Sequence, residues 1–221
     1  MKYAVLLFFM SCVSINAQTQ DLSADTVVQD SITTRPEHLY AEDLAWPYIK
    51  IGVGTWLPQG KMADFQETAF EFELSLEFPS ETKKRSFEFG IQFIPLNQQR
   101  NYTINTTDGP FGVRGTLMMN GFMRFKKYMF KSSKAHFEMG AGIGISSIFL
   151  DTVDVQDEDI LEDENTNTIL FIPGLAYLYE FEDESKLILG IDLQYSPYQL
   201  EGSPISEIGS MAVIPKVSYR F

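Results

Sequence analysis

Cysteine is nearly absent from this chain of 221 residues. The single cysteine, Cys12, lies in an amino-terminal segment with the pattern of a secretory signal: Lys2, the apolar run 4–10, and small residues before a cleavage site after Ala17. Residues 1–17 are therefore predicted to be removed, which leaves a mature chain that cannot form a disulfide. The alternative is a lipoprotein acylated at Cys12, although the apolar run is unusually short for one.

Long apolar runs are absent beyond that segment. A membrane-spanning helix needs roughly 18–20 consecutive apolar residues, and no later part of the chain approaches this length. A helical membrane protein is therefore excluded. A membrane protein built from strands is not excluded, because such strands turn half of their residues away from lipid. The abundance of aromatic residues, with 18 Phe and 10 Tyr, fits the aromatic girdles of such proteins.

Basic charge is scarce. The chain has 17 Lys and Arg against 30 Asp and Glu, a formal net charge of −13. This balance argues against a nucleic-acid partner, because phosphate binding needs a basic surface. Residues 18–45 are polar and acidic without a sustained period and are interpreted as a flexible leader. The remainder, 46–221, has the length of one domain.

This remainder alternates apolar and polar residues over eight stretches, which is the period of strands that have different surroundings on their two faces. In 70–78, the clearest, phenylalanine and leucine fill every second position and glutamate or serine fills the others. Each stretch is long enough for a tilted strand that crosses a bilayer, which needs about 9–11 residues. The stretches are 48–57, 70–78, 85–94, 113–126, 136–149, 168–181, 186–195 and 211–221.

The connections between the stretches are alternately short and long. Residues 80–84 and 182–185 are short connections, whereas 58–69 and 150–167 are long ones. This alternation predicts an all-β fold, an eight-stranded antiparallel up-and-down transmembrane β-barrel with tight turns at one end and larger loops at the other.

The polar faces of the stretches carry charges of both signs in nearly equal numbers. An eight-stranded barrel has an interior only wide enough for side chains, so we expect these charges to lie inside and to pair with one another. Arg114 and Arg124 are expected to pair with glutamates of the second and third stretches. The predicted interior charges are Arg114, Arg124, Lys126, Glu71, Glu73, Glu88, Glu138, Asp192 and Arg220.

The opposite arrangement is a soluble, lipocalin-like barrel that turns its apolar face inward and binds a ligand there. The apolar face of this chain is rich in Phe, Leu, Met and Val on every stretch. It is too broad and too aromatic for eight strands to hide inside a narrow lumen. We therefore expect the apolar face to contact lipid.

The last stretch, 211–221, alternates strictly and ends in Tyr-Arg-Phe. It resembles the terminal strand of bacterial outer-membrane β-barrels, where the last residues act as an assembly signal. With the signal segment and eight strands, the chain resembles small barrels of the OmpX/OmpA type, and most closely the PorT-like barrel proteins of Bacteroidetes. The resemblance implies an outer-membrane location, with the leader 18–45 on the periplasmic side. The implied partners are outer-membrane lipid and lipopolysaccharide, the barrel-assembly machinery and other envelope proteins.

One histidine is a candidate for catalysis. His136 opens the fifth stretch, and Glu138 points to the same face. Some barrels that resemble this one modify lipid A with a histidine, a hydroxyl group and a carboxylate. No serine follows His136 at the His-x-Ser spacing, so a structural His–Glu pair inside the barrel is the preferred interpretation.

The long connection 150–167 is dense in carboxylates. Asp154, Asp157 and Asp159 are weak candidates for binding a divalent cation through oxygen ligands. The spacing is not that of an EF-hand, and the turn glycine of such a loop is missing, so a solvated acidic loop is favoured. No cofactor is predicted.

These observations predict a non-enzymatic integral outer-membrane barrel whose loops mediate surface or envelope-assembly interactions. The two alternatives are a lipid A-modifying enzyme and a soluble ligand-binding barrel. A conducting pore is less expected, because eight strands leave no open channel.

Overall fold

The computed structural model describes residues 47–80, 85–106, 109–131, 135–153, 165–183, 185–199 and 207–221. The predicted signal and leader lie outside these residues and stay predictions. No helix within the described residues is long and apolar enough to span a membrane. The elements are β1 (Tyr48–Gln59), a short 3₁₀ helix η2 (Gly60–Asp64), β2 (Ala69–Ser80), β3 (Arg85–Pro95), β4 (Tyr102–Thr106), β5 (Gly109–Lys131), β6 (Ala135–Thr152), β7 (Asn165–Glu180), β8 (Lys186–Gln199) and β9 (Glu207–Arg220).

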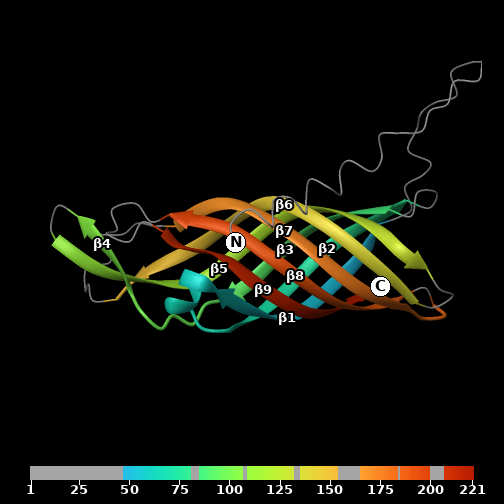
Figure 1. Cartoon of the computed structure of the whole chain (residues 1–221), viewed down its shortest axis with the longest axis horizontal. Coiled ribbons are helices and arrows are strands. Elements are labelled where there is room, and N and C mark those ends of the chain that lie inside the picture. The colour runs from blue at the N-terminus through green and yellow to red at the C-terminus, as the bar shows by residue number, and fades with distance from the viewer. Residues whose placement is uncertain are drawn as a thin grey trace, which may run out of the picture. The chain divides into compact units, whose positions relative to one another are not determined.

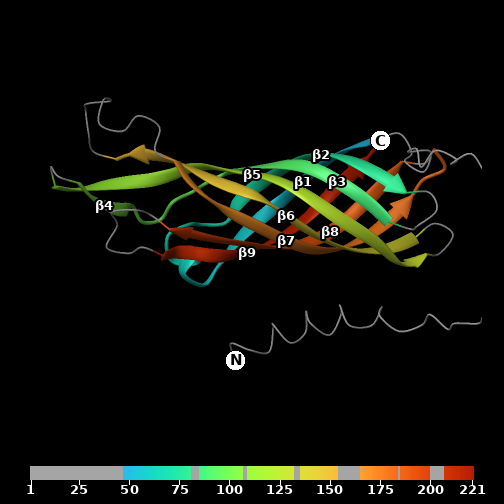
Figure 2. The same ribbon diagram turned by 90° about the horizontal axis from the view of Figure 1, so that it is seen from above.

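Eight of these strands close into an antiparallel barrel, which confirms the predicted fold class. Neighbouring strands pair in chain order, β3 pairs directly with β5, and β1 pairs with β9 to close the cylinder (Figures 1 and 2). The closing register joins Lys50 to Arg220 and Val53 to Val217. We call the end with the β2–β3, β5–β6 and β7–β8 turns the short-turn end, and the other the long-loop end.

The alternation in sequence becomes an alternation between the lumen and the outer surface. On β2, Leu74 is 45% exposed on the outer face, whereas the next residue, Ser75, is 2% exposed inside. The outer face carries a belt of exposed phenylalanine, leucine, isoleucine and methionine on every barrel strand. Burying this belt in hydrocarbon, rather than exposing it to water, is the arrangement that the hydrophobic effect favours.

Two strands extend beyond the rest of the barrel at the long-loop end. β3 leaves the sheet where Pro95 pairs with Leu117, but β5 continues back to Gly109 and pairs there with β4. β6 likewise pairs with β5 as far as Thr152. Figure 2 shows β4 and this part of β5 beyond the other strands. The strand β4 was not predicted from the sequence.

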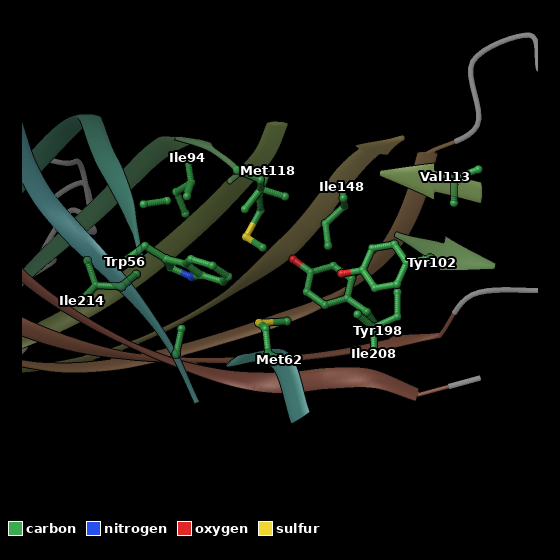
Figure 3. Close-up of a cluster of buried hydrophobic side chains, with 13 residues drawn as sticks. Trp56, Met62, Ile94, Tyr102, Val113, Met118, Ile148, Tyr198, Ile208 and Ile214 are labelled. Carbon is green, nitrogen blue, oxygen red and sulfur yellow. The ribbon is translucent and has the colours of Figure 1, made fainter. Parts of the chain in front are cut away.

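The lumen is divided into a charged half and an apolar half. The charged half lies toward the short-turn end, a division of the lumen that was not predicted from the sequence. The apolar half lies toward the long loops, where Figure 3 shows Trp56, Met62 and Met118 converging on one space. The members of this apolar core are Trp56, Met62, Ala69, Ile94, Leu96, Tyr102, Val113, Met118, Ile148, Tyr198, Ile208, Ala212 and Ile214.

The short helix η2 closes the apolar half at the long-loop end. Its residue Met62 is 1% exposed and packs against Gly209 of β9. Gly209 has a φ of 125°, and a Cβ there would collide with the Met62 backbone. Glycine is the residue that adopts this conformation without strain, so Gly209 allows η2 to pack closely against β9 in the barrel mouth.

The assignment of the two faces can be tested on β2. Replacing Leu74 with Arg puts a charge on the lipid-facing surface and should lower the free energy of unfolding by about 2–4 kcal/mol. Ser75→Ala, a change on the inner face one residue away, should have a much smaller effect. A urea titration of barrels refolded into lipid vesicles measures both, and equal losses would contradict the assignment.

Candidate functional site

The charged half of the lumen is a continuous network of buried ion pairs. Lys50 Nζ lies 2.8 Å from Glu73 Oε1 and 2.7 Å from Glu88 Oε1. Lys126 Nζ lies 2.7 Å from Glu88 Oε2 and 3.0 Å from Glu77 Oε2. Lys50 and Lys126 therefore each bridge carboxylates, which gives these two buried charges their counter-charges.

A second group of cations connects opposite walls of the barrel. Lys216 Nζ on β9 lies 2.5 Å from Glu73 Oε2 on β2 and 2.6 Å from Asp192 Oδ2 on β8. Arg124 on β5 reaches the same Asp192 oxygen at 2.7 Å. The Lys216–Glu73 and Arg124–Asp192 contacts fix strands that are not neighbours in the sheet, whereas the Lys216–Asp192 contact joins the neighbouring strands β8 and β9.

Most of the charges predicted to be interior lie in this network. The structure places Arg124, Lys126, Glu71, Glu73, Glu88, Glu138, Asp192 and Arg220 in the buried interior. Arg124 forms an ion pair with Glu88 on the neighbouring β3 at 3.8 Å, as predicted, but its nearest carboxylate is Asp192 across the lumen, which was not predicted as its partner. Lys50 and Lys216 also belong to the network, and each of them contacts two carboxylates.

Arg114 does not lie in the interior, contrary to the prediction. A register shift between Gly115 and Leu117 interrupts the β5–β6 ladder and reverses the alternation beyond it. Arg114 consequently points outward, where its side chain is 55% exposed and its Nη2 lies 3.1 Å from Asp151 Oδ2. An exposed pair of this kind contributes little to stability.

The histidine pair predicted from sequence has a different partner. His136 Nε2 lies 2.8 Å from Glu180 Oε2 on β7, whereas Glu138 contacts Lys126 Nζ at 3.2 Å. Glu180 also lies 3.3 Å from Lys186 Nζ. His136 sits buried at the short-turn end, and its hydrogen bond with Glu180 joins β6 to β7.

The candidate metal ligands Asp154, Asp157 and Asp159 lie outside the described residues, so their role stays a prediction. In the parts of the chain that are described, no group of three or more His, Cys, Asp or Glu residues could hold a metal ion.

Outside the barrel wall, in the β7–β8 turn, hydrogen bonds from the Ser185 hydroxyl and backbone N–H hold the pKa of Asp183 below its usual value.

A folded cap covers the long-loop end. The segment after η2 pairs with the segment after β3: Glu67 N donates to Asn97 O at 2.7 Å and Gln99 N donates to Phe65 O at 2.8 Å. The Gln66 side chain is buried beneath this pairing and donates to Tyr102 Oη at 2.9 Å. The cap therefore consists of η2, the paired segments 65–67 and 96–99, and the β4–β5 hairpin.

The cap was missed at the level of sequence because its contacts join segments far apart in the chain. One local signal was present: residues 102–106 alternate before the turn residues Thr107-Asp108-Gly109, a pattern that is typical of a hairpin. The pairing of Gln66 with Gln98 has no such signal.

The fold matches known structures, although no protein-family model and no curated protein matches the chain. Neisserial surface protein A superposes with a TM-score of 0.57 at 9% sequence identity, over 81% of this chain and 98% of that one. The chain has the fold of the small outer-membrane β-barrels. The N-terminal barrel domain of Pseudomonas aeruginosa OprF aligns at a TM-score of 0.44 and 10% identity, over 80% of this chain and 99% of that one. A major outer membrane protein from Thermus thermophilus aligns at 0.45 and 8% identity, over 79% and 99%.

The match to Neisserial surface protein A supports the barrel class of the predicted resemblance. A more specific likeness to PorT-like proteins stays a prediction. The outer-membrane barrel fold also accommodates many unrelated functions, so function has to be argued from the interior and the cap.

The ion network should be sensitive to the loss of one partner. Arg124→Met leaves Asp192 short of a counter-charge and should lower the free energy of unfolding by about 3–5 kcal/mol. Adding Asp192→Asn should recover part of this loss. Arg114→Met is the control, since Arg114 is exposed. Urea unfolding in detergent micelles measures all three, and equal costs for Arg114→Met and Arg124→Met would contradict the network.

Glu71 and Glu73 of β2 should differ in how much their neutralisation lowers the stability of the barrel. Both carboxylate oxygens of Glu71 are buried without a hydrogen-bond partner among the described residues, whereas Glu73 contacts Lys50 and Lys216. Glu73→Gln removes the counter-charge of two ammonium groups and should cost several kcal/mol, about 3–5. Glu71→Gln removes an unpaired buried carboxyl and should cost less than about 1 kcal/mol. Urea unfolding in detergent micelles measures both variants. A larger loss of unfolding free energy for Glu71→Gln than for Glu73→Gln would refute this assignment.

Proposed function

We propose that this protein is a non-enzymatic, integral outer-membrane β-barrel whose long-loop end presents a rigid binding surface to other proteins at the cell surface or in the envelope. The observation that carries the proposal is the folded cap, in which the loops pack into the barrel mouth and onto one another. Binding residues are commonly placed on loops that a rigid scaffold holds.

The outer belt of apolar side chains supports the membrane location. A closed barrel satisfies every backbone group within the wall, which is the requirement for crossing hydrocarbon. Short turns and both ends of the described chain lie together, whereas the long loops lie at the other end. In barrels of this class the longer loops are extracellular, so the cap is placed outside the cell.

The filled lumen supports a role other than transport or ligand storage. The charged half is occupied by bridging ion pairs, and the apolar half is packed around Trp56 and closed by Met62. A cavity among the charged side chains has a volume of about 20 Å³, which is room for about one water molecule. The ligand site of a soluble, lipocalin-like barrel, or an open pore, would need a far larger cavity.

The β4 edge supports strand addition as the mode of binding. Within the described residues β4 pairs only with β5, so its other edge offers unpaired backbone groups. The strand contains no charged residue and no proline, the two features that commonly protect an exposed edge from pairing. An extended segment of a partner protein can add to such an edge through backbone hydrogen bonds.

The edge can be tested with a pair of proline substitutions. Gly112, the cross-strand partner of Thr103, accepts a hydrogen bond from the Val153 N–H on the side away from β4. Successive residues of a strand point their backbone N–H groups to opposite sides, so Asn105→Pro removes a donor on the free edge, whereas Ile104→Pro breaks the β4–β5 pairing. A photo-crosslinker at exposed Thr103 reports contacts in intact cells, with a crosslinker at lipid-facing Leu74 as control. The proposal expects a discrete protein adduct specific to position 103, which Asn105→Pro abolishes while the barrel still folds. Adducts identical at both crosslinker positions, or unaffected by either proline, would contradict it.

A further inference from the structure

Two basic residues lie side by side on the outer face at the short-turn end. Arg85 begins β3 and is the direct cross-strand partner of Lys127 on β5. Both side chains are exposed, in contrast to that of Lys126, the residue before Lys127, which is buried. Directly opposed residues on one face of an antiparallel pair have Cβ atoms about 4.5–5.5 Å apart, so the two cationic groups can reach a single anion.

Neither cation has an anionic partner in the described protein. The structure gives Arg85 one contact, a cation–π interaction with its guanidinium carbon 5.8 Å from the centre of the Phe125 ring, and no ion pair is present for either side chain among the described residues. The outward positions of β2 and β3 carry no carboxylate, nor do those of β5 and β6 on the short-turn side of Arg114 and Asp151. Like charges directly opposed across strands repel one another, so an anion bound between them would relieve the repulsion.

The surface next to the basic pair is aromatic. Phe87 and Phe125 form the next pair on the same face of the ladder, and Phe89 contacts Phe87 with ring centres 4.7 Å apart. Phe89 is 44% exposed and Phe125 is 49% exposed on the outer face. Aromatic side chains of this kind mark the boundary between headgroups and hydrocarbon. The two cations therefore lie at the headgroup level when the apolar belt is in the membrane.

We propose that Arg85 and Lys127 form a binding site for the phosphate of an anionic phospholipid in the leaflet at the short-turn end. The guanidinium and ammonium groups bind the phosphate oxygens through charge-assisted hydrogen bonds. The acyl chains lie along Phe87, Phe89 and Phe125. This continuity of a cationic pair with an exposed apolar surface favours a lipid over a free phosphate ion, which would use only the charges.

The site is local to one side of the barrel. At the same end, the β7–β8 turn presents exposed Glu182 and Asp183, beside the exposed aromatic residues Tyr179 and Phe181. An anionic headgroup is repelled there and attracted at Arg85 and Lys127, although both places are aromatic. The protein should thus bind an anionic lipid at the β3–β5 strand pair rather than attract anionic lipids evenly around its circumference.

The inference rests on the proposed membrane insertion, and the test separates the two. The barrel is refolded into phosphatidylcholine nanodiscs with and without a minor fraction of phosphatidylglycerol. Resistance to heat-induced unfolding on a gel, measured in phosphatidylcholine alone, reports insertion for each variant. Native mass spectrometry then counts the lipids retained by the released protein and gives the affinity for phosphatidylglycerol.

The variant Arg85→Gln/Lys127→Gln should insert normally but lose phosphatidylglycerol affinity on the order of tenfold. The matched control is Arg100→Gln/Arg114→Gln, which removes two exposed basic residues at the long-loop end and should retain the wild-type affinity. Glycerophosphate in solution, at a concentration comparable to that of phosphatidylglycerol, should not displace the bound lipid.

Equal retention by the wild type and the Arg85/Lys127 variant, or an equal loss in the control, would overturn the lipid site while leaving insertion intact. Displacement by glycerophosphate would show that the pair recognises phosphate alone and would overturn the assignment to a lipid. Failure of the wild type to insert would instead refute the membrane function on which the site depends.

Discussion

The narrow lumen is the constraint on which the rest of this structure depends. Eight strands leave no space for bulk water, so a polar side chain that points inward is stabilised by partners within the protein. Lys50, Lys126 and Lys216 accordingly bridge two or three carboxylates each. The lumen thereby becomes a cross-linked core instead of a passage.

The two halves of the lumen hold the barrel in different ways. In the charged half, pairs such as Lys216 with Glu73 and Arg124 with Asp192 connect walls that share no ladder. In the apolar half, close packing around Trp56 does the same without charge and extends upward into the cap through Met62 and Tyr102. The cap is thus continuous with the core of the barrel, which gives the loops a fixed position relative to the strands.

Sequence predicted the strands well, because a period of two is a local property that a single stretch such as 70–78 displays. The inner face of β5 was predicted correctly at Arg124 and Lys126 but not at Arg114, because the register shift near Gly115 leaves no clear mark in the pattern. The contact of Arg124 with Asp192 could not be predicted, since contacts across a lumen depend on the stagger of all eight strands. The cap was missed for the same reason: the pairing of Gln66 with Gln98 is determined by where two loops meet in space.

The closing seam between β1 and β9 has a consequence for how the chain acquires its structure. Ile49, in the first strand, accepts a hydrogen bond from the backbone N–H of Phe221, the last residue. The ladder that removes the two open edges therefore joins the most distant parts of the barrel sequence. Pairings of such long range make folding slow, because the entropy of closing the intervening chain is lost before the contacts form. Until β9 pairs with it, β1 remains an open edge exposed to misassembly, so the closing seam is the step of folding at which the barrel is most open to wrong partners.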